Sequence, residues 1–400
     1  MGNVNGSCRV GPLEIKKPKV LFLVTEDWYF WSHRLPLARA IRDAGFQVLV
    51  ATKVDKFNRL LQEEQFKVYP ISLRRNSKNP IRELWAVIEL IKIYRDERPD
   101  LVHHVALKPI MYGSIAARVA KVPAIVNAFA GLGSVFIAMG WRAQFLRKFL
   151  GMVLNAVLSL KNGKVIFQNR DDSSMFINAG IIPSGKIALI KGSGVDMSSF
   201  KPVPEALGVP CVILASRMLL DKGVREFVEA ASLLKAAGVT ARFILAGNPD
   251  NENPTSISED QLESWKESGA VDWWRHSDNM PEVFGKASIV CLPSYREGLP
   301  KVLIEAAASG RAIVATDTPG CREIVRHGEN GLLVPIRDSR ALADALRRLL
   351  DDRSLREKMG ARGRQIAVSE FSVEKVISET ISIYKELLKD KWPSSVSEVL

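Results

Sequence analysis

Short apolar runs alternate with helix-like segments along most of the chain, and this alternation limits the possible folds more than any other feature. The first run, KVLFLVTE, precedes a segment with helical periodicity, RLPLARAIRDAG, and similar pairs follow to about residue 200. A second alternation begins near residue 210 with PCVILAS and VREFVEAASLLKAAG. Continuous apolar strands separated by helices are typical of parallel sheets covered on both faces. The pattern predicts an α/β protein with two doubly wound sheets.

The two alternations also predict the domain organisation. Three prolines are concentrated in KPVPEALGVP, where the first alternation ends. We expect a flexible leader at residues 1–18, a Rossmann-like domain at 19–195, a second one at 205–370, and a terminal helix at 371–390 that returns to the first domain. Ligands of such sheets bind beyond the carboxyl ends of the strands, so functional residues are expected in the loops that face a cleft between the domains.

Composition excludes several classes of protein. With 47% hydrophobic and 25% charged residues, the chain is not intrinsically disordered. The four cysteines, Cys8, Cys211, Cys291 and Cys321, form no CxxC pair, which argues against a disulfide framework or a zinc site and favours a reducing, cytoplasmic compartment. The first eighteen residues lack an apolar core, which argues against a secretory signal.

The excess of positive charge lies in the first half of the chain. Residues 1–200 contain 29 Lys and Arg against 15 Asp and Glu, whereas residues 201–400 contain 27 against 29. A basic domain beside a neutral one indicates an anionic partner, and nucleic acid, acidic lipid and phosphorylated substrates all qualify, as does a merely solvated basic surface.

Residues 122–141 are uncharged and long enough to span a bilayer. Pro123 and three glycines instead favour a buried strand, VPAIVNAF, with a glycine-rich loop after it. The next segment, WRAQFLRKFLGMVLNAVL, contains Arg142, Arg147 and Lys148 on an amphipathic pattern. It predicts a helix that lies on an anionic membrane surface, or one that packs on the sheet with a basic outer face.

Three common motifs are absent from the sequence. The turn after the first strand, TEDWYFWSHRLP, contains no glycine, which argues against the GxGxxG fingerprint of dehydrogenases. No P-loop and no HExxH pattern occurs, which argues against a kinase or ATPase and against a zinc metalloprotease.

Two segments of the second half suit an anionic ligand. Arg217 and Lys222 follow the strand PCVILAS and precede a helix that begins at Gly223. Two cations beside a helix N-terminus are suited to binding a diphosphate. Alternatively, they are two exposed basic residues of a loop. In LPSYREGLPKVLIEAAASG, a tight turn with Glu297 and Gly298 leads into a helix carrying Glu305. Gly298 permits close approach of a ligand, and the Glu305 carboxylate suits the vicinal hydroxyls of a ribose.

These segments, with FILAGN and RAIVATDTPGCREIV, resemble the retaining nucleotide-sugar glycosyltransferases of the GT-B fold over roughly residues 19–390. The two glutamates of the family's signature match Glu297 and Glu305, and its phosphate-binding arginine and lysine match Arg217 and Lys222. FWSHRLPLARAI, ALKPIMYGSIAAR, NAFAGLGSVF and GNPDNENPTSI resemble, more narrowly, bacterial enzymes that extend sugars on a polyprenyl diphosphate carrier.

The resemblance implies two Rossmann-like domains facing a central cleft, with the acceptor bound by the first domain and a nucleotide sugar, commonly a UDP-sugar, by the second. It implies transfer of a hexose or N-acetylhexosamine with retention, no metal or other cofactor, and no nucleic-acid partner. The enzyme would lie in the cytoplasm, peripherally on the inner face of the membrane, against its anionic surface. The implied catalytic residues are Arg217, Lys222 and Glu297, the donor-binding residues Gly247, Glu297, Gly298, Leu299, Pro300 and Glu305, and the acceptor-binding residues His33, Lys108, Gly131 and Gly133.

Two alternatives share this architecture: an isomerase resembling UDP-sugar 2-epimerases, and a non-catalytic membrane scaffold. The basic first half argues against the isomerase, and the presence of Arg217, Lys222, Glu297 and Glu305 argues against the scaffold. One departure concerns the family's His-x-His, because this chain has adjacent His103 and His104 and a valine at 105.

Overall fold

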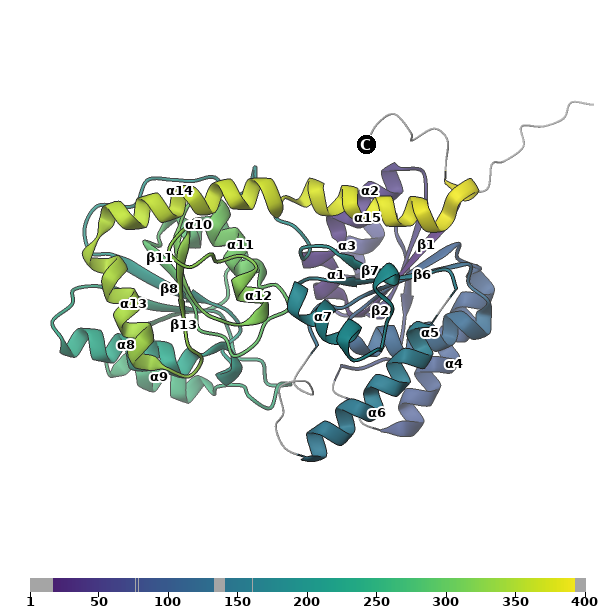
Figure 1. Cartoon of the computed structure of the whole chain (residues 1–400), viewed down its shortest axis with the longest axis horizontal. Coiled ribbons are helices and arrows are strands. Elements are labelled where there is room, and N and C mark those ends of the chain that lie inside the picture. Colours follow the sequence, from purple (N-terminus) through teal and green to yellow (C-terminus); the bar gives the residue numbers. More distant parts are fainter. Residues whose placement is uncertain (1–16, 76, 78, 133–140, 160, 393–400) are drawn as a thin grey trace, which may run out of the picture.

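The computed structural model describes residues 17–75, 77, 79–132, 141–159 and 161–392, and for residues 141–149 and 390 it describes the backbone only. These residues form two domains that lie side by side, each with a parallel sheet between helices (Figure 1). The predicted fold of two Rossmann-like domains is confirmed.

The N-terminal domain contains a seven-stranded sheet of order β3-β2-β1-β4-β5-β6-β7, in which every neighbouring pair is parallel. Its elements are β1 (Lys19–Glu26), α1 (Asp27–His33), α2 (Leu35–Asp43), β2 (Gln47–Lys53), α3 (Asn58–Glu63), β3 (Lys67–Pro70), α4 (Pro80–Glu97), β4 (Leu101–Val105), α5 (Leu107–Ala120), β5 (Ala124–Ala128), α6 (Trp141–Leu158), β6 (Gly163–Phe167), α7 (Arg170–Asn178) and β7 (Ile187–Leu189).

The C-terminal domain contains a six-stranded parallel sheet of order β10-β9-β8-β11-β12-β13. Its elements are β8 (Cys211–Ala215), α8 (Val224–Ala236), β9 (Arg242–Ala246), α9 (Glu259–Glu267), β10 (Asp272–Trp274), α10 (Met280–Gly285), β11 (Ile289–Leu292), α11 (Lys301–Ala308), β12 (Ala312–Thr316), α12 (Pro319–Arg322), β13 (Gly331–Val334), α13 (Ser339–Asp351) and α14 (Arg353–Glu370).

The order of strands positions the functional loops. In each sheet the direction of strand addition reverses once, between β1 and β4 in the first domain and between β8 and β11 in the second. At such a reversal the loops after neighbouring strands diverge and leave a crevice for ligands. The strands β4, β5, β8 and β12 are buried at every residue, as expected for sheets covered on both faces.

The last helix, α15 (Val373–Leu388), joins the two domains. It follows α14 along one edge of the molecule and runs from the C-terminal onto the N-terminal domain (yellow in Figure 1). Ile381, Tyr384 and Leu388 belong to the same apolar core as Val20 and Phe22 of β1. The second domain is therefore tied to the first through the core as well as through the linker near residue 200.

The structure adds elements that the periodicity did not predict. The helix α1 occupies the segment after β1, and β10, α9, α10 and α12 are short elements between the predicted ones. Segments this short carry no complete apolar period. Two of the helices are stabilised by side-chain caps: Ser258 accepts from the amide of Gln261 at the start of α9, and Asn279 accepts from the amide of Glu282 at the start of α10. Among the described residues, none of the helices has both the length and the hydropathy that a bilayer crossing requires.

Candidate active site

A cavity of about 660 Å³ lies between the two domains at the carboxyl ends of their strands. Trp28, Tyr29 and His33 of α1 line it from the N-terminal domain. The loops after β8, β9 and β11, with the start of α11, line it from the other side. Of the predicted site residues, eight of the C-terminal domain and His33 line this one cavity: Arg217, Lys222, Gly247, Glu297, Gly298, Leu299, Pro300 and Glu305.

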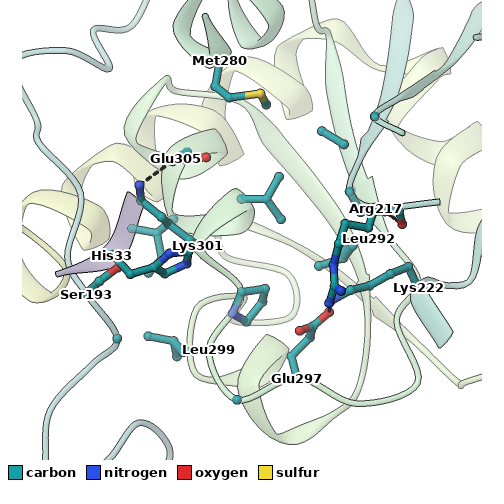
Figure 2. Close-up of a pocket in the computed structure, with 18 of the residues that line it drawn as sticks. His33, Ser193, Arg217, Lys222, Met280, Leu292, Glu297, Leu299, Lys301 and Glu305 are labelled. Atoms are coloured by element: carbon teal, nitrogen blue, oxygen red, sulfur yellow. Dashed lines mark hydrogen bonds and ion pairs between the residues drawn. The ribbon is translucent and has the colours of Figure 1, made fainter. Parts of the chain in front are cut away.

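The loop after β8 holds Arg217 and Lys222. It ends at Gly223, whose φ of 72° is left-handed and whose Cβ would lie 2.1 Å from the carbonyl oxygen of Pro293. Only glycine fits here, so the loop closes against the end of β11 and the side chain of Lys222 turns toward Glu297. Figure 2 shows Arg217 and Lys222 side by side, facing Glu297.

Both cations are paired in the structure. The Lys222 Nζ lies 2.5 Å from Oε1 of Glu297, which also accepts a hydrogen bond of 2.6 Å from the Ser294 hydroxyl. The guanidinium of Arg217 bonds to the carboxylate of Asp250 and is 40% exposed. To bind a diphosphate in the cavity, Lys222, Arg217 or both would therefore exchange the carboxylate partner for an oxygen of the diphosphate.

The helix α11 begins at the cavity and carries a buried acid. Glu305 is 7% exposed, and burial raises its pKa against the opposing effect of Lys301, whose Nζ lies 3.4 Å from Oε1 (Figure 2). Lys301 also donates a hydrogen bond of 3.2 Å to the carbonyl of Ser32 in the other domain. This lysine was not predicted, although its spacing of four residues from Glu305 on one helix face was a usable signal.

His33 faces Lys301 across the cleft (Figure 2). Its ring stacks on Tyr29 with centroids 4.3 Å apart, and its Nδ1 lies 2.6 Å from the Ser32 hydroxyl. Burial and the positive charges of Lys301 and Arg34 lower its pKa to about 3. His33 is therefore neutral near pH 7 and offers a hydrogen bond rather than a charge.

Other predicted acceptor residues lie elsewhere. The Lys108 ammonium donates to the carbonyls of Arg74 and Ser77 and to Glu83, and it does not line the cavity. Gly131 contacts the backbone of Gly298, next to the cavity wall. Gly133 lies outside the described residues, as do the side chains of Arg142, Arg147 and Lys148.

His103 and His104 are buried away from the cavity. His103 Nδ1 lies 2.5 Å from the Tyr384 hydroxyl of α15, and His104 contacts the Tyr94 hydroxyl and Asn127. Burial lowers the pKa of both rings. In the described structure both histidines contact side chains of the domain interior, and His103 links α15 to the N-terminal sheet.

A polar seam between the domains holds the turn that carries Glu297. Asn169, at the N-terminus of α7, donates a hydrogen bond of 2.8 Å to the carbonyl of Gly298, and the guanidinium of Arg296 pairs with the carboxylate of Asp172. A Cβ on Gly298 would lie 2.5 Å from the carbonyl oxygen of Ala130. The residues on both sides of Glu297 are thus held by the opposite domain, and no local sequence pattern indicates this.

Comparison with known proteins identifies the family. Residues 19–169 match the model of the glycosyl transferase 4-like family, and residues 209–352 match that of the glycosyl transferases group 1. The chain is 30% identical, over 93% of its length and 100% of the relative's, to the N,N'-diacetylbacillosaminyl-diphospho-undecaprenol alpha-1,3-N-acetylgalactosaminyltransferase of Campylobacter jejuni. The chain belongs to the group 1 glycosyltransferases. The predicted membership of a glycosyltransferase family and the predicted enzyme class, a glycosyltransferase, are confirmed.

Two further proteins are similar to this glycosyltransferase over most of its length. It is 23% identical, over 78% of its length and 81% of the relative's, to the UDP-Gal:alpha-D-GlcNAc-diphosphoundecaprenol alpha-1,3-galactosyltransferase of Escherichia coli. Its fold is similar to that of Anabaena HepE in complex with UDP, with a TM-score of 0.75, 20% identity, and coverage of 92% of this chain and 100% of the other. At that identity the likeness concerns the GT-B fold alone.

Proposed function

We propose that this glycosyltransferase moves a sugar, with retention of anomeric configuration, from a UDP-sugar to a saccharide linked to a polyprenyl diphosphate. The observation that carries the proposal is the convergence of Arg217, Lys222, Glu297 and Glu305 in one cavity that the N-terminal domain closes from the other side. The names of the Campylobacter and Escherichia relatives, both of which include a diphospho-undecaprenol acceptor, support the acceptor class. The name of the Escherichia relative, which includes UDP-Gal, supports the donor class.

The cations of the cavity would stabilise the departing diphosphate. As the bond from the anomeric carbon to the diphosphate oxygen breaks, negative charge grows on that oxygen, and Arg217 and Lys222 lie where they could neutralise it. Donors aimed at a developing charge contribute about 3–4 kcal/mol each in comparable sites. Because cations and helix amides meet this charge, we propose that turnover needs no metal ion.

The remaining residues would hold the donor. Glu305 is buried at the end of the cavity beside Lys301 and is suited to accept two hydrogen bonds from the ribose hydroxyls. Glu297 and the backbone from Gly298 to Pro300 would contact the transferred sugar and the phosphates. Uptake of the donor then requires that Lys222 exchange its bond to Glu297 for one to the diphosphate.

The acceptor is expected at the N-terminal side of the cavity, near the neutral ring of His33. Because its lipid carrier stays in the bilayer, we propose that the enzyme binds the inner face of the cell membrane peripherally, through the basic first half. The isomerase and the scaffold are less well supported, since both named relatives are transferases of matching length.

The decisive experiment incubates the protein with a panel of UDP-sugars and a polyprenyl-diphosphate-linked saccharide, and follows the acceptor by mass spectrometry. Transfer should add one hexose or N-acetylhexosamine to the acceptor, and NMR of the product should show the anomeric configuration of the donor. Epimerised donor without acceptor modification would favour the isomerase. Inversion at the anomeric carbon would overturn the retaining mechanism.

A further inference from the structure

The outer face of α4 exposes large apolar side chains to solvent. Ile81, Leu84, Trp85 and Ile88 are 66%, 61%, 62% and 45% exposed. Their spacing of three, one and three residues places them on one face of a helix. The opposite face is the one that packs on the sheet, through the buried residues Ala86, Leu90 and Tyr94. The exposed face is therefore not needed for the domain core, and a contiguous apolar surface of this kind marks an interaction site.

The same face becomes basic in the second half of the helix. Lys92 and Arg95 follow Ile88 at intervals of four and three residues, and both are exposed. Three of the four acidic side chains of α4 are engaged by other parts of the protein: Glu83 by Lys108, Glu89 by Ser72, and Glu97 by Lys19 and Lys67. The outward surface thus combines an apolar stripe with net positive charge.

The neighbouring helices extend this character. The helix α5 packs beside α4, and its residues Ile115, Arg118 and Val119 are exposed. The seventy residues from 101 to 170, which include α5 and α6, contain nine lysines and arginines and no aspartate or glutamate. In Figure 1, α4, α5 and α6 lie on the same side of the N-terminal domain. The excess of basic residues in this part of the chain favours an anionic partner.

The segment before α4 contacts the C-terminal domain near the active-site cavity. Arg75, in the loop before α4, lies 3.5 Å from the carboxylate of Asp250, which also pairs with Arg217 of the cavity. The segment that leads into α4 is therefore in contact with the C-terminal domain beside Arg217.

We propose that the outward face of α4 docks this glycosyltransferase on an anionic bilayer, with Ile81, Leu84, Trp85 and Ile88 in the interfacial layer. Lys92 and Arg95 then contact the lipid headgroups. The inference rests on the proposed function, because a lipid-linked acceptor is presented at such a surface. A helix with an apolar stripe and basic flanks binds in the plane of the interface, and tryptophan is favoured at that depth. Docking therefore has an apolar component that high salt alone does not remove.

The test measures binding to vesicles by flotation. Vesicles of phosphatidylcholine alone are compared with vesicles containing phosphatidylglycerol, at low and high salt. The double variant L84Q/W85Q keeps helix-forming residues at both positions and should bind anionic vesicles at least about tenfold more weakly, since burial of each side chain contributes about a factor of ten or more. The matched control is Leu233→Gln on α8, 43% exposed in the other domain, which should bind as the unsubstituted protein does.

Depth of insertion gives a second readout. The described cysteines, Cys211, Cys291 and Cys321, are buried. In a Cys8→Ser background, a cysteine introduced by Trp85→Cys can therefore be labelled selectively with an environment-sensitive fluorophore. The emission should shift to the blue on anionic vesicles. No shift, or unchanged binding of L84Q/W85Q, overturns the proposal. Loss of a dimer in L84Q/W85Q, seen by sedimentation, also overturns it, because the face would then be covered by a second copy.

Failure of this inference and failure of the proposed function are distinguishable. If the protein binds no vesicles but transfers sugar to a short-chain, water-soluble acceptor, docking through α4 is wrong and the function stands. If it binds anionic vesicles through α4 but transfers sugar to no diphosphate-linked acceptor, docking stands and the function is wrong.

Discussion

Arg296 and Asp172 form an ion pair that is buried between the two domains, with side chains 17% and 3% exposed. Arg296 immediately precedes Glu297, and Asp172 lies in the first turn of α7 together with Asn169, the cap that bonds to Gly298. The turn carrying Glu297 is therefore positioned by the N-terminal domain. The contact between the domains and the placement of the Glu297 carboxylate are therefore coupled through Arg296 and Gly298.

We predict that Asp172→Asn lowers kcat about tenfold or more and changes the donor KM little. The amide keeps the shape but not the charge that holds Arg296, so the turn at Glu297 loses its orientation. The matched control is Asp171→Asn, because that neighbouring carboxylate is 44% exposed and lies 3.3 Å from Arg322. Steady-state kinetics of both variants decide the question, and equal losses in the two would contradict a positioning role.

Arg217→Ala should lower turnover by about two to three powers of ten, because its charge matters most as the diphosphate departs. The fold should persist, since the side chain is 40% exposed. Arg242→Ala, which removes an exposed arginine paired with Asp272 in the same domain, serves as the control. A higher donor KM with unchanged kcat, or a large loss of melting temperature, would disprove the role of leaving-group cation.

Glu305 should act on donor affinity instead. Both Glu305→Ala and the more conservative Glu305→Gln should raise the donor KM, with a smaller effect on kcat, because bonds to ribose hydroxyls are present in the ground and transition states alike. Glu282→Gln, at an exposed pair with Lys286, is the control. Titration calorimetry with UDP separates binding from turnover, and unchanged UDP affinity in Glu305→Gln would refute the assignment.

The acid Glu97 should make stability depend on pH. Burial alone would raise the pKa of Glu97, but hydrogen bonds from Lys19, Lys67 and Tyr69 outweigh burial and lower it to about 2. The charged form is therefore favoured by folding, and this stabilisation is full above the ordinary pKa of 4.5 and is lost as the pH falls toward 2. Glu97→Gln should cost about 2 kcal/mol at pH 7 and progressively less below pH 4.5. Urea unfolding at several pH values measures this, with the exposed Glu263→Gln as control; a pH-independent difference would contradict it.

Turnover should not change when a chelator is added, because Arg217, Lys222 and helix amides are expected to meet the charge of the diphosphate. The assay compares initial rates with and without EDTA, and then with added Mg²⁺ or Mn²⁺. Activity that disappears with chelation and returns with the divalent ion would refute this prediction.

Much of the fold was predictable because its determinants are local. The strand β1 was predicted at its observed limits, and α15 within two residues at each end, since the apolar pattern of each is complete within neighbouring residues. The helix α1 was missed, because its seven residues include four consecutive aromatic side chains and no complete apolar period. Its histidine was nevertheless predicted as a site residue, from the family resemblance rather than from periodicity.

For the site, the sequence alone determined the side chains that strand-end loops bring to the cleft, since the carboxyl ends of parallel strands share an edge. Only the tertiary structure decided what those side chains contact: Arg217 lies against Asp250, Lys301 reaches Ser32 of the other domain, and Lys108 turns to Glu83 instead of the cavity. The partners of the inter-domain contacts are more than a hundred residues apart in the chain. Their pairing depends on how two independently predictable sheets pack against each other, and this packing is set by long-range complementarity that no local period encodes.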